Sequence, residues 1–543
     1  MRKIFLLAFL CFSLLLFIVS CCPKDPKLNS VKTAHGNTDW HIDTAEEFLT
    51  GQDMNGAVSA TNHCPDTWTK THMHVGLTNT NIYYYDRDRI NSGKDIDLTN
   101  GIDKPMLFFY AGHGSPLSFN TLGNSAILTN MRIGNCTGFN NGTLRYYWQC
   151  SCEVFAHGPK NCANTTYYYA CPGDFDGSND SDNMRNVYQR WGPIIHPSLR
   201  MACGSSTLAY CHETETNKIW DNYNNKGYDV ADSFIEGLHR YNWNTPLCIT
   251  TGGLFVGGTP LFDQTFTIKK NPSGKYYHIQ YLSNFATTAP IGVLVEIPEF
   301  LPIYEVVPPP LPDPYREMKF RKEGEWMYSV EKVEGRDSKV KINLNSGAIY
   351  VSGTRHFDEK LKALSEEKYI QEAGLIINKQ GLAEKDISGP IGTRMVIDRI
   401  PKEGKFSEIA RFQKNVIVTF KRQVIIENKI VNFVGEGGVI SIQLNNDGSI
   451  LNATKVWRTI KGIRKITKAK AQQQALKEAM EKIKEKEAYR IADWTWGYKE
   501  EAGNVKQSEL RSVYIYNFVP KDLEKSRDFP PRVIEISAHL EEK

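Results

Sequence analysis

The chain has 543 residues, a formal net charge of +4 and 41% hydrophobic residues. This length allows two or three domains, each with an apolar core of its own. The net charge is too small to indicate a nucleic-acid partner, because nucleic-acid-binding proteins neutralise several phosphates with clustered basic side chains.

The first twenty residues have the pattern of an export signal. Two basic residues precede an almost unbroken apolar run, Ile4–Val19, and Cys21 follows it closely. This order is similar to the lipobox of bacterial lipoproteins, in which the cysteine receives the lipid. We therefore expect a signal peptide over 1–20, a polar tether over 21–34, and an exported protein lipid-anchored to the bacterial cell envelope. An uncleaved anchor or an ordinary secretory peptide is the alternative.

Composition divides the rest of the chain into four parts. A cysteine-rich domain is expected over 35–295, followed by a linker over 296–319 that contains seven prolines. The remainder is rich in Lys and Glu, lacks cysteine, and contains two similar units, 320–460 and 461–543. Each unit is expected to be an α+β module with a helix over an antiparallel sheet, in contact with the first domain.

The predicted elements of the first domain alternate between strands and helices. In chain order they are a helix at Thr44–Leu49, strands at Met106–Tyr110 and Leu144–Trp148, a strand near Pro193–Ala202, a helix at Asp229–Arg240 and a strand at Pro246–Thr251. This alternation predicts an α/β domain with a central, mostly parallel sheet.

The second half is predicted from its helical spacing and its apolar runs. The helices are expected at Asp358–Glu372 and Lys468–Glu487, and the strands at Ile409–Phe420, Val424–Ile426, Val439–Leu444, Trp494–Tyr498 and Ser512–Phe518. Each helix precedes its strands, which gives the two units the same order.

His113 and Cys152 stand close to the ends of two predicted strands. The strand Met106–Tyr110 stops in Gly112–Gly114, and Cys152 follows the strand Leu144–Trp148. Neighbouring parallel strands build sites at their common carboxyl edge. A histidine beside a cysteine lowers the pKa of the thiol and produces the reactive thiolate. The spacing therefore indicates a thiolate–imidazole pair.

This order resembles the caspase, legumain and gingipain group of cysteine peptidases. His113-Gly114 matches the first block of that group, and Ser151-Cys152-Glu153 resembles the second. The resemblance implies that Cys152 is the nucleophile, that His113 is the acid–base, and that the Gly114 N–H forms part of an oxyanion hole. It also implies an acyl-enzyme mechanism on a protein or peptide substrate.

The first domain also resembles a bacterial extracellular family of unknown function. The likeness covers residues 35–270 and includes the His-Gly block, the Ser-Cys-Glu block and a domain end near Trp191 and Ala231–Phe234. This family gives no substrate. It supports a caspase-like fold for the first domain.

Other cysteines and histidines offer alternatives to this pair. Cys203 and Cys150 are the second and third candidates for the nucleophile, and His157 is a rival base. Nine cysteines lie between Cys64 and Cys248, which in an oxidising compartment predicts disulfides of unknown connectivity. If the candidate cysteines are oxidised, the protein is instead a non-catalytic, disulfide-stapled binding protein of the cell envelope.

No metal ion or cofactor is expected. His72 and His74 alternate as zinc ligands sometimes do, but no third ligand accompanies them. The acidic segment Gly173–Gly177 lacks the glycine and glutamate spacing of an EF-hand, so a solvated loop is the better interpretation.

Three segments of the second half resemble PepSY-type modules and the propeptides of secreted metallopeptidases. These segments are Phe433–Val439, Asn446–Gly448 and Val456–Arg458. The resemblance implies a regulatory or chaperone-like module that acts on the first domain. A module that only binds the cell envelope is the alternative.

Overall fold

The described part of the chain contains most of the second half and separate segments of the first. The computed structural model describes residues 30–36, 69–75, 106–111, 114–115, 118–121, 124–127, 145–150, 155, 199–205, 213–239, 246–251, 255–256, 259–260, 276–285, 297–333, 336–353, 361–401, 410–483, 485–521 and 532–540. The predicted signal peptide, the tether and the helix at Thr44–Leu49 therefore lie outside the described residues, apart from the end of the tether.

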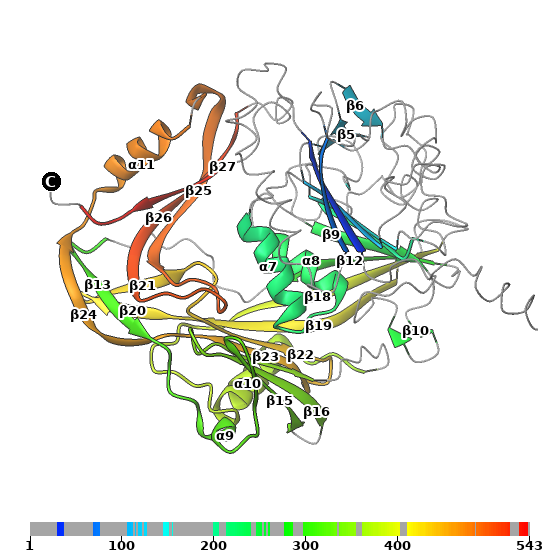
Figure 1. Ribbon diagram of the computed structural model, residues 1–543, viewed down its shortest axis with the longest axis horizontal. Helices are drawn as coiled ribbons and strands as arrows, with labels where there is room; N and C mark the ends of the chain where they lie inside the picture. Colours follow the sequence, from blue (N-terminus) through cyan, green and yellow to red (C-terminus); the bar gives the residue numbers. More distant parts are fainter. Residues whose placement is uncertain are drawn as a thin grey trace, which may run out of the picture.

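One 15-stranded sheet runs through both halves of the chain (Figure 1). Its order is β14-β15-β16-β17-β23-β22-β19-β18-β12-β9-β8-β7-β3-β1-β2. The first-half strands are β1 (Ser30–Gly36), β2 (Thr69–Val75), β3 (Leu107–Ala111), β7 (Tyr146–Cys150), β8 (Met201–Ser205), β9 (Pro246–Thr251) and β12 (Tyr276–Asn284). The others are β14 (Arg321–Glu323), β15 (Trp326–Val333), β16 (Arg336–Asn343), β17 (Ile349–Gly353), β18 (Ile391–Pro401), β19 (Ala410–Lys421), β22 (Val439–Leu444) and β23 (Ile450–Val456).

The prediction of a mostly parallel, caspase-like α/β sheet is wrong. Only four pairings among the described strands of this sheet are parallel, namely β1–β2, β1–β3, β3–β7 and β7–β8. From β8 onward every neighbour is antiparallel, and the strands of 320–460 extend the sheet of the first half. The described part of the chain is mostly β. An apolar run indicates that a strand is buried, but it does not indicate whether the neighbouring strand is parallel or antiparallel.

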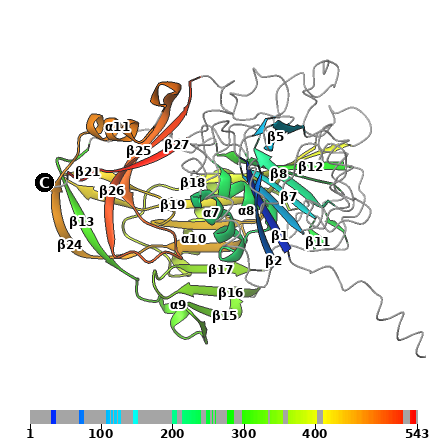
Figure 2. The ribbon, with the colours of Figure 1, turned by 45° about the horizontal axis from the view of Figure 1, so that its top comes forward.

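Two helices, α7 (Glu213–Asn224) and α8 (Val230–Leu238), lie together over the middle of this sheet (Figures 1 and 2). As the spacing predicted, Val230, Phe234 and Leu238 of α8 are fully buried. Gly237 lets the two helices approach closely, because a Cβ atom there would lie 2.8 Å from Cα of Ile219. The core beneath them contains Trp148 of β7.

Helix α10 (Glu366–Lys379) packs against the antiparallel strands of the second half. Tyr369, Ala373 and Ile376 share a core cluster with residues of β16, β17, β19 and β22. The helix begins later than predicted because Ser365 caps it, accepting a hydrogen bond from the Lys368 N–H.

A second, strongly curved sheet contains the end of the chain (Figure 2). Its path is β20 (Gln423–Ile426), β21 (Lys429–Val434), β25 (Tyr489–Lys499), β26 (Glu509–Pro520), β13 (Phe300–Val307) and β24 (Thr459–Lys468), with β27 (Arg532–Ser537) paired to β26. Helix α11 (Gln472–Glu481) covers one face, where Ala475 and Ala479 are fully buried. This helix is shorter than the predicted Lys468–Glu487.

The proline-rich segment 296–319 is more than a spacer. Residues 300–307 form β13, which pairs with β24 along its length and with the start of β26. The short helix α9 (Asp313–Arg316) follows.

The remaining described elements are small. They are β4 (Gly114–Ser115), β5 (Ser118–Thr121) and β6 (Asn124–Ile127) in one sheet, β10 (Phe255–Val256) paired with β11 (Thr259–Pro260), and a 3-10 turn at Lys486–Ala488. None of the described helices has the length and apolar character needed to cross a bilayer.

Candidate functional site

The first candidate site is the edge of the sheet where β3 and β7 end. These strands are adjacent and parallel, and their last residues, Ala111 and Cys150, are register partners. His113 and Cys152 each follow a strand end by two residues in the sequence, but both lie outside the described residues. Gly114 begins β4, where it pairs with Phe119 of β5. The pairing of the two strands agrees with the sequence analysis, whereas the catalytic roles stay predictions.

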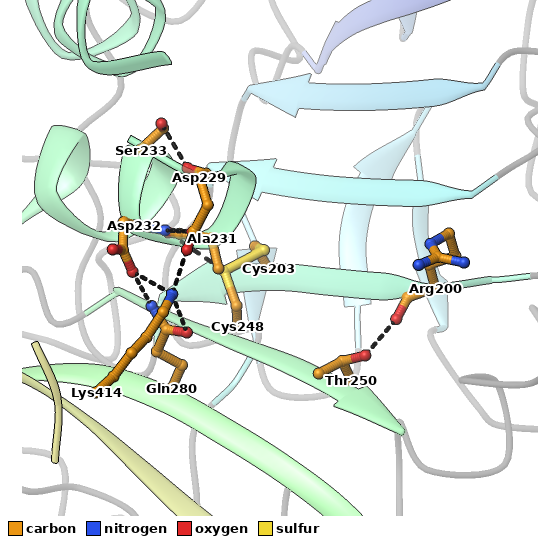
Figure 3. Close-up of a disulfide and its surroundings, with 10 residues drawn as sticks. All are labelled: Arg200, Cys203, Asp229, Ala231, Asp232, Ser233, Cys248, Thr250, Gln280 and Lys414. Atoms are coloured by element: carbon orange, nitrogen blue, oxygen red, sulfur yellow. Dashed lines mark hydrogen bonds and ion pairs between the residues drawn. A yellow bond between two sulfur atoms is a disulfide. The ribbon is translucent and has the colours of Figure 1, made fainter. Parts of the chain in front are cut away.

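The structure argues against the other two cysteine candidates as nucleophiles, because one is in a disulfide and the other is buried. Cys203 of β8 forms a disulfide with Cys248 of β9, and the two residues face each other across the antiparallel pair (Figure 3). A disulfide sulfur is not a nucleophile, so Cys203 is excluded in this state. Cys150 is 1% exposed within the apolar core, where no substrate reaches it.

The described residues contain no group of three or more His, Cys, Asp or Glu side chains placed to hold a metal ion. His72 and His74 lie in β2, as the alternation predicted. The acidic segment Gly173–Gly177 and the rival base His157 lie outside the described residues.

A second candidate is a buried polar network between α8 and the sheet (Figure 3). Nζ of Lys414, from β19, lies 2.5 Å from Oδ2 of Asp229 and 2.7 Å from Oδ1 of Asp232. It also donates to Oε1 of Gln280 at 3.0 Å. The Gln280 side-chain amide in turn donates to Asp232.

Asp232 has further donors from the second half of the chain. Its Oδ2 accepts a hydrogen bond from Asn415 at 2.8 Å and one from Gln443 of β22 at 3.0 Å. Asp229 caps α8, with its Oδ1 accepting from the Asp232 N–H at 2.8 Å. The side chains of this network are all at least nine-tenths buried. Buried ionised groups are stable only when they are paired and hydrogen-bonded, and this network meets that condition.

An irregularity in β19 supplies two neighbouring side chains to this network. Met395 of β18 pairs with Asn415, but Val396 pairs with Gln413, so Lys414 is an extra residue in its strand. Consecutive side chains of a regular strand point to opposite faces, whereas a bulge re-aims one of them. Lys414 and Asn415 therefore both contact α8.

The residues on either side of this bulge keep to the opposite face. Gln413 donates to the Tyr369 hydroxyl of α10. Val416 lies in the core cluster that contains α10. The bulge is therefore local and leaves the rest of β19 in regular alternation.

The network has two carboxylates and one ammonium group, and its remaining side chains are neutral amides. Each of its carboxylate oxygens already accepts at least one hydrogen bond within the protein. The arrangement can hold helix α8 in one position on the sheet.

A serine and a histidine also meet in the second half, at β26. The Ser512 N–H donates to Nε2 of His539 at 3.0 Å, and Nδ1 of His539 lies 2.7 Å from Oγ1 of Thr467. Burial, together with the positive charges of Arg511 and Lys470, lowers the pKa of His539 to about 4. Because Ser512 is fully buried and the histidine is held neutral by its surroundings, the pair is structural.

Sequence reasoning missed the buried network. One signal was present: polar residues interrupt apolar runs at Gln280, at Lys414 and Asn415, and at Gln443. Asp232 also lies inside a helix that is otherwise almost entirely buried. A buried polar residue in a strand calls for a partner, but sequence alone does not identify that partner.

Comparisons with known proteins add little to this geometry. No protein-family model matches the chain, and no curated protein matches it. One solved structure, an uncharacterized protein from Eubacterium rectale, aligns with 44% of this chain and 85% of its own, at 8% sequence identity and a TM-score of 0.26. A likeness at this level carries no argument about fold or function.

Proposed function

We propose that the protein is an exported thiol hydrolase that cleaves amide bonds with Cys152 as nucleophile and His113 as acid–base. The observation that carries this proposal is the register of β3 and β7, whose ends, Ala111 and Cys150, lie side by side. In the sequence, His113 and Cys152 each follow one of these strand ends by two residues. Cys203 and Cys150 are less suitable, because one is oxidised and the other lies in the core.

The reaction follows from the chemistry of the pair. The thiolate of Cys152 attacks the carbonyl carbon of a peptide, and a carbon–sulfur bond replaces the carbon–nitrogen bond. The imidazolium of His113 gives its proton to the leaving amine. Water then attacks the thioester and gives a proton to His113, and the carbon–sulfur bond breaks to release the carboxylic acid, which ionises in solvent, and to restore the Cys152 thiolate beside the His113 imidazolium.

The test is alkylation of the native, unreduced protein with iodoacetamide, followed by peptide mapping. Cys152 should label rapidly, and His113→Ala should slow this labelling by about tenfold, because the thiolate fraction falls when the imidazolium is removed. His157→Ala is the matched control and should leave the rate unchanged. Cleavage of a mixed peptide library should then disappear in Cys152→Ala.

A second function is favoured by one specific observation, the Cys203–Cys248 disulfide. Disulfides persist in oxidising compartments, so this bond supports an exported protein but does not require an enzyme. If Cys152 labels only after reduction, it is itself oxidised. The chain is then a disulfide-stapled binding protein of the cell envelope.

Attachment to the membrane is part of the same proposal. A lipid on Cys21 would hold the protein at the cell envelope after export, with the polar segment 22–29 as its tether, because Ser30 already begins strand β1 of the sheet. Cys21→Ala should move the protein from the membrane fraction to the soluble fraction. Equal partition of the variant and the parent protein would contradict lipid attachment.

A further inference from the structure

We infer that Lys414 is a positioning residue through which the second half of the chain fixes helix α8 against the strands of the first half. Figure 3 shows its side chain reaching from the sheet toward Asp229 and Asp232 at the start of α8. The helix and these two acids belong to the first half, and the lysine belongs to the second. The interface between the halves is therefore ionic as well as apolar.

A second lysine of the second half also contacts the layer formed by α7 and α8. Nζ of Lys341, from β16, donates to the backbone carbonyl of Asn224 at 2.5 Å and lies 3.5 Å from Oδ1 of Asn225, next to α7. Burial lowers the pKa of Lys341, and the nearby carboxylate of Asp221 in α7 offsets only part of this shift. Both contacts place a lysine of the second half against the α7–α8 layer. The second half thus supplies two lysine side chains to this layer, one bonded to carboxylates and one to neutral oxygens.

The bulge in β19 shows that this contact is built into the sheet. A regular strand would direct either Lys414 or Asn415 toward α8, and the extra residue directs both. The sheet is also continuous here, because β12 of the first half pairs with β18 over nine residues. The neighbouring strand β19 then brings Lys414 beneath the helix.

Helix α8 in turn packs against β7, the strand that ends at the edge of the first candidate site. The ring of Phe234 lies 5.3 Å from that of Trp148, and Trp148 lies in β7. Only this last link rests on the proposed function, because it concerns the edge that carries Cys152. The link from Lys414 to α8 and β7 stands without it.

The experiment is hydrogen exchange of the full-length protein, read by mass spectrometry for α8, β7 and β26. Lys414→Met leaves two buried carboxylates without their cation, so amide exchange should rise at least tenfold in Val230–Leu238 and Tyr146–Cys150. Strand β26 should change much less. Asp229→Asn combined with Lys414→Met restores the original net charge of the network and keeps an oxygen acceptor at the cap, so it should recover most of the protection.

The control is Lys461→Met, which removes a lysine that is 63% exposed and paired with Glu305 on the surface. It should leave exchange in all three segments unchanged. Unchanged exchange in α8 for Lys414→Met would overturn the inference. Exchange that rises equally in α8 and β26, with no recovery in the double variant, would also overturn it, since that is a general loss of stability. None of these outcomes depends on Cys152, so the inference and the proposed function fail separately.

Discussion

Two buried charged clusters each join two parts of this molecule, and they satisfy their buried charges with different kinds of partner. The Lys414 cluster joins the two halves within the 15-stranded sheet. A second cluster, formed by Arg422, Arg458 and Glu500, joins that sheet to the curved sheet. Arg422 separates β19 from β20, and Arg458 separates β23 from β24, so both arginines lie where the chain passes from one sheet to the other.

The two clusters differ in the sign of their excess charge and in the partners they use. Lys414 is surrounded by side-chain oxygens and depends on two aspartates. Arg458 instead donates to the backbone carbonyls of Ala502 at 3.0 Å and Val505 at 2.5 Å, as well as to Glu500. A guanidinium group has five donors in a fixed plane, whereas an ammonium group is a compact charge. The arginine cluster is therefore anchored to the backbone, and the lysine cluster to other side chains.

Of the changes considered for these buried groups, removal of the Glu500 carboxylate should lower the free energy of unfolding most. Glu500→Gln removes the buried carboxylate that pairs with both Arg422 and Arg458, so the free energy of unfolding should fall by about 3–5 kcal/mol. Urea denaturation measures this loss. The matched control is Glu501→Gln, whose side chain is 35% exposed and paired with Lys499, and it should cost less than about 1 kcal/mol. Similar losses in both variants would contradict the special role of Glu500.

His539 differs from both charged clusters because it is a buried base that is neutral. Its pKa in the folded protein, about 4, lies below the ordinary value of 6.5. The unfolded state therefore binds the proton first, so the contribution of this group is complete above pH 6.5 and is lost as the pH falls from 6.5 to 4. The loss should be on the order of 2–3 kcal/mol.

The measurement is the free energy of unfolding of the parent protein and of His539→Gln between pH 7.5 and 4. Glutamine offers hydrogen-bonding groups at this position but does not titrate there. The difference between the two proteins should therefore shrink as the pH falls. A difference that is independent of pH would show that His539 does not carry this dependence.

A substitution at Gly237 tests the close contact of α7 and α8, which involves no charged side chain. Gly237→Ala places a Cβ atom against the Ile219 side chain and 2.8 Å from its Cα, so the helices must separate. This overpacking should cost about 1–3 kcal/mol in thermal unfolding. Gly374, in α10, has no atom within 4 Å of the position that a Cβ would occupy, so Gly374→Ala should instead stabilise the protein by about 0.5–1 kcal/mol. Two changes of the same sign would contradict this contrast.

The smallest effect is expected for a surface ion pair. Lys461 and Glu305 lie 3.0 Å apart, and their side chains are 63% and 47% exposed. Lys461→Met should change the free energy of unfolding by less than about 1 kcal/mol, because solvent screens the pair. A loss comparable with that of Glu500→Gln would mean that burial does not separate strong from weak pairs here.

The sequence predicted many individual elements well. The strands at Pro246–Thr251 and Val439–Leu444 have the observed bounds, and the predicted strand Ile409–Phe420 corresponds to β19. The apolar face of α8 was also found correctly, because its side chains repeat with the helical period and are all buried. Such local patterns depend only on neighbouring residues.

The arrangement of these elements was not predictable in the same way. Nothing in the strand Tyr276–Asn284 reveals that its partner is β18, from the other half of the chain. The bulge at Lys414 was hidden as well, because it arises from the register between two strands. Of the candidate site, the adjacent strand ends were anticipated, while the oxidised state of Cys203 depended on its facing Cys248.

The pairing of β12 with β18 sets an order of events during synthesis and export. Tyr276 pairs with Pro401 and Asn284 with Thr393, so over a hundred residues separate the partners. Until the later strand has emerged, β12 has one edge with unpaired N–H and C=O groups, which other chains can bind. Long-range pairings of this kind also form slowly. The sheet of the first half therefore stays incomplete until the second half has been synthesised. A chain whose synthesis stops before residue 393 keeps an unpaired strand edge to which other chains can bind.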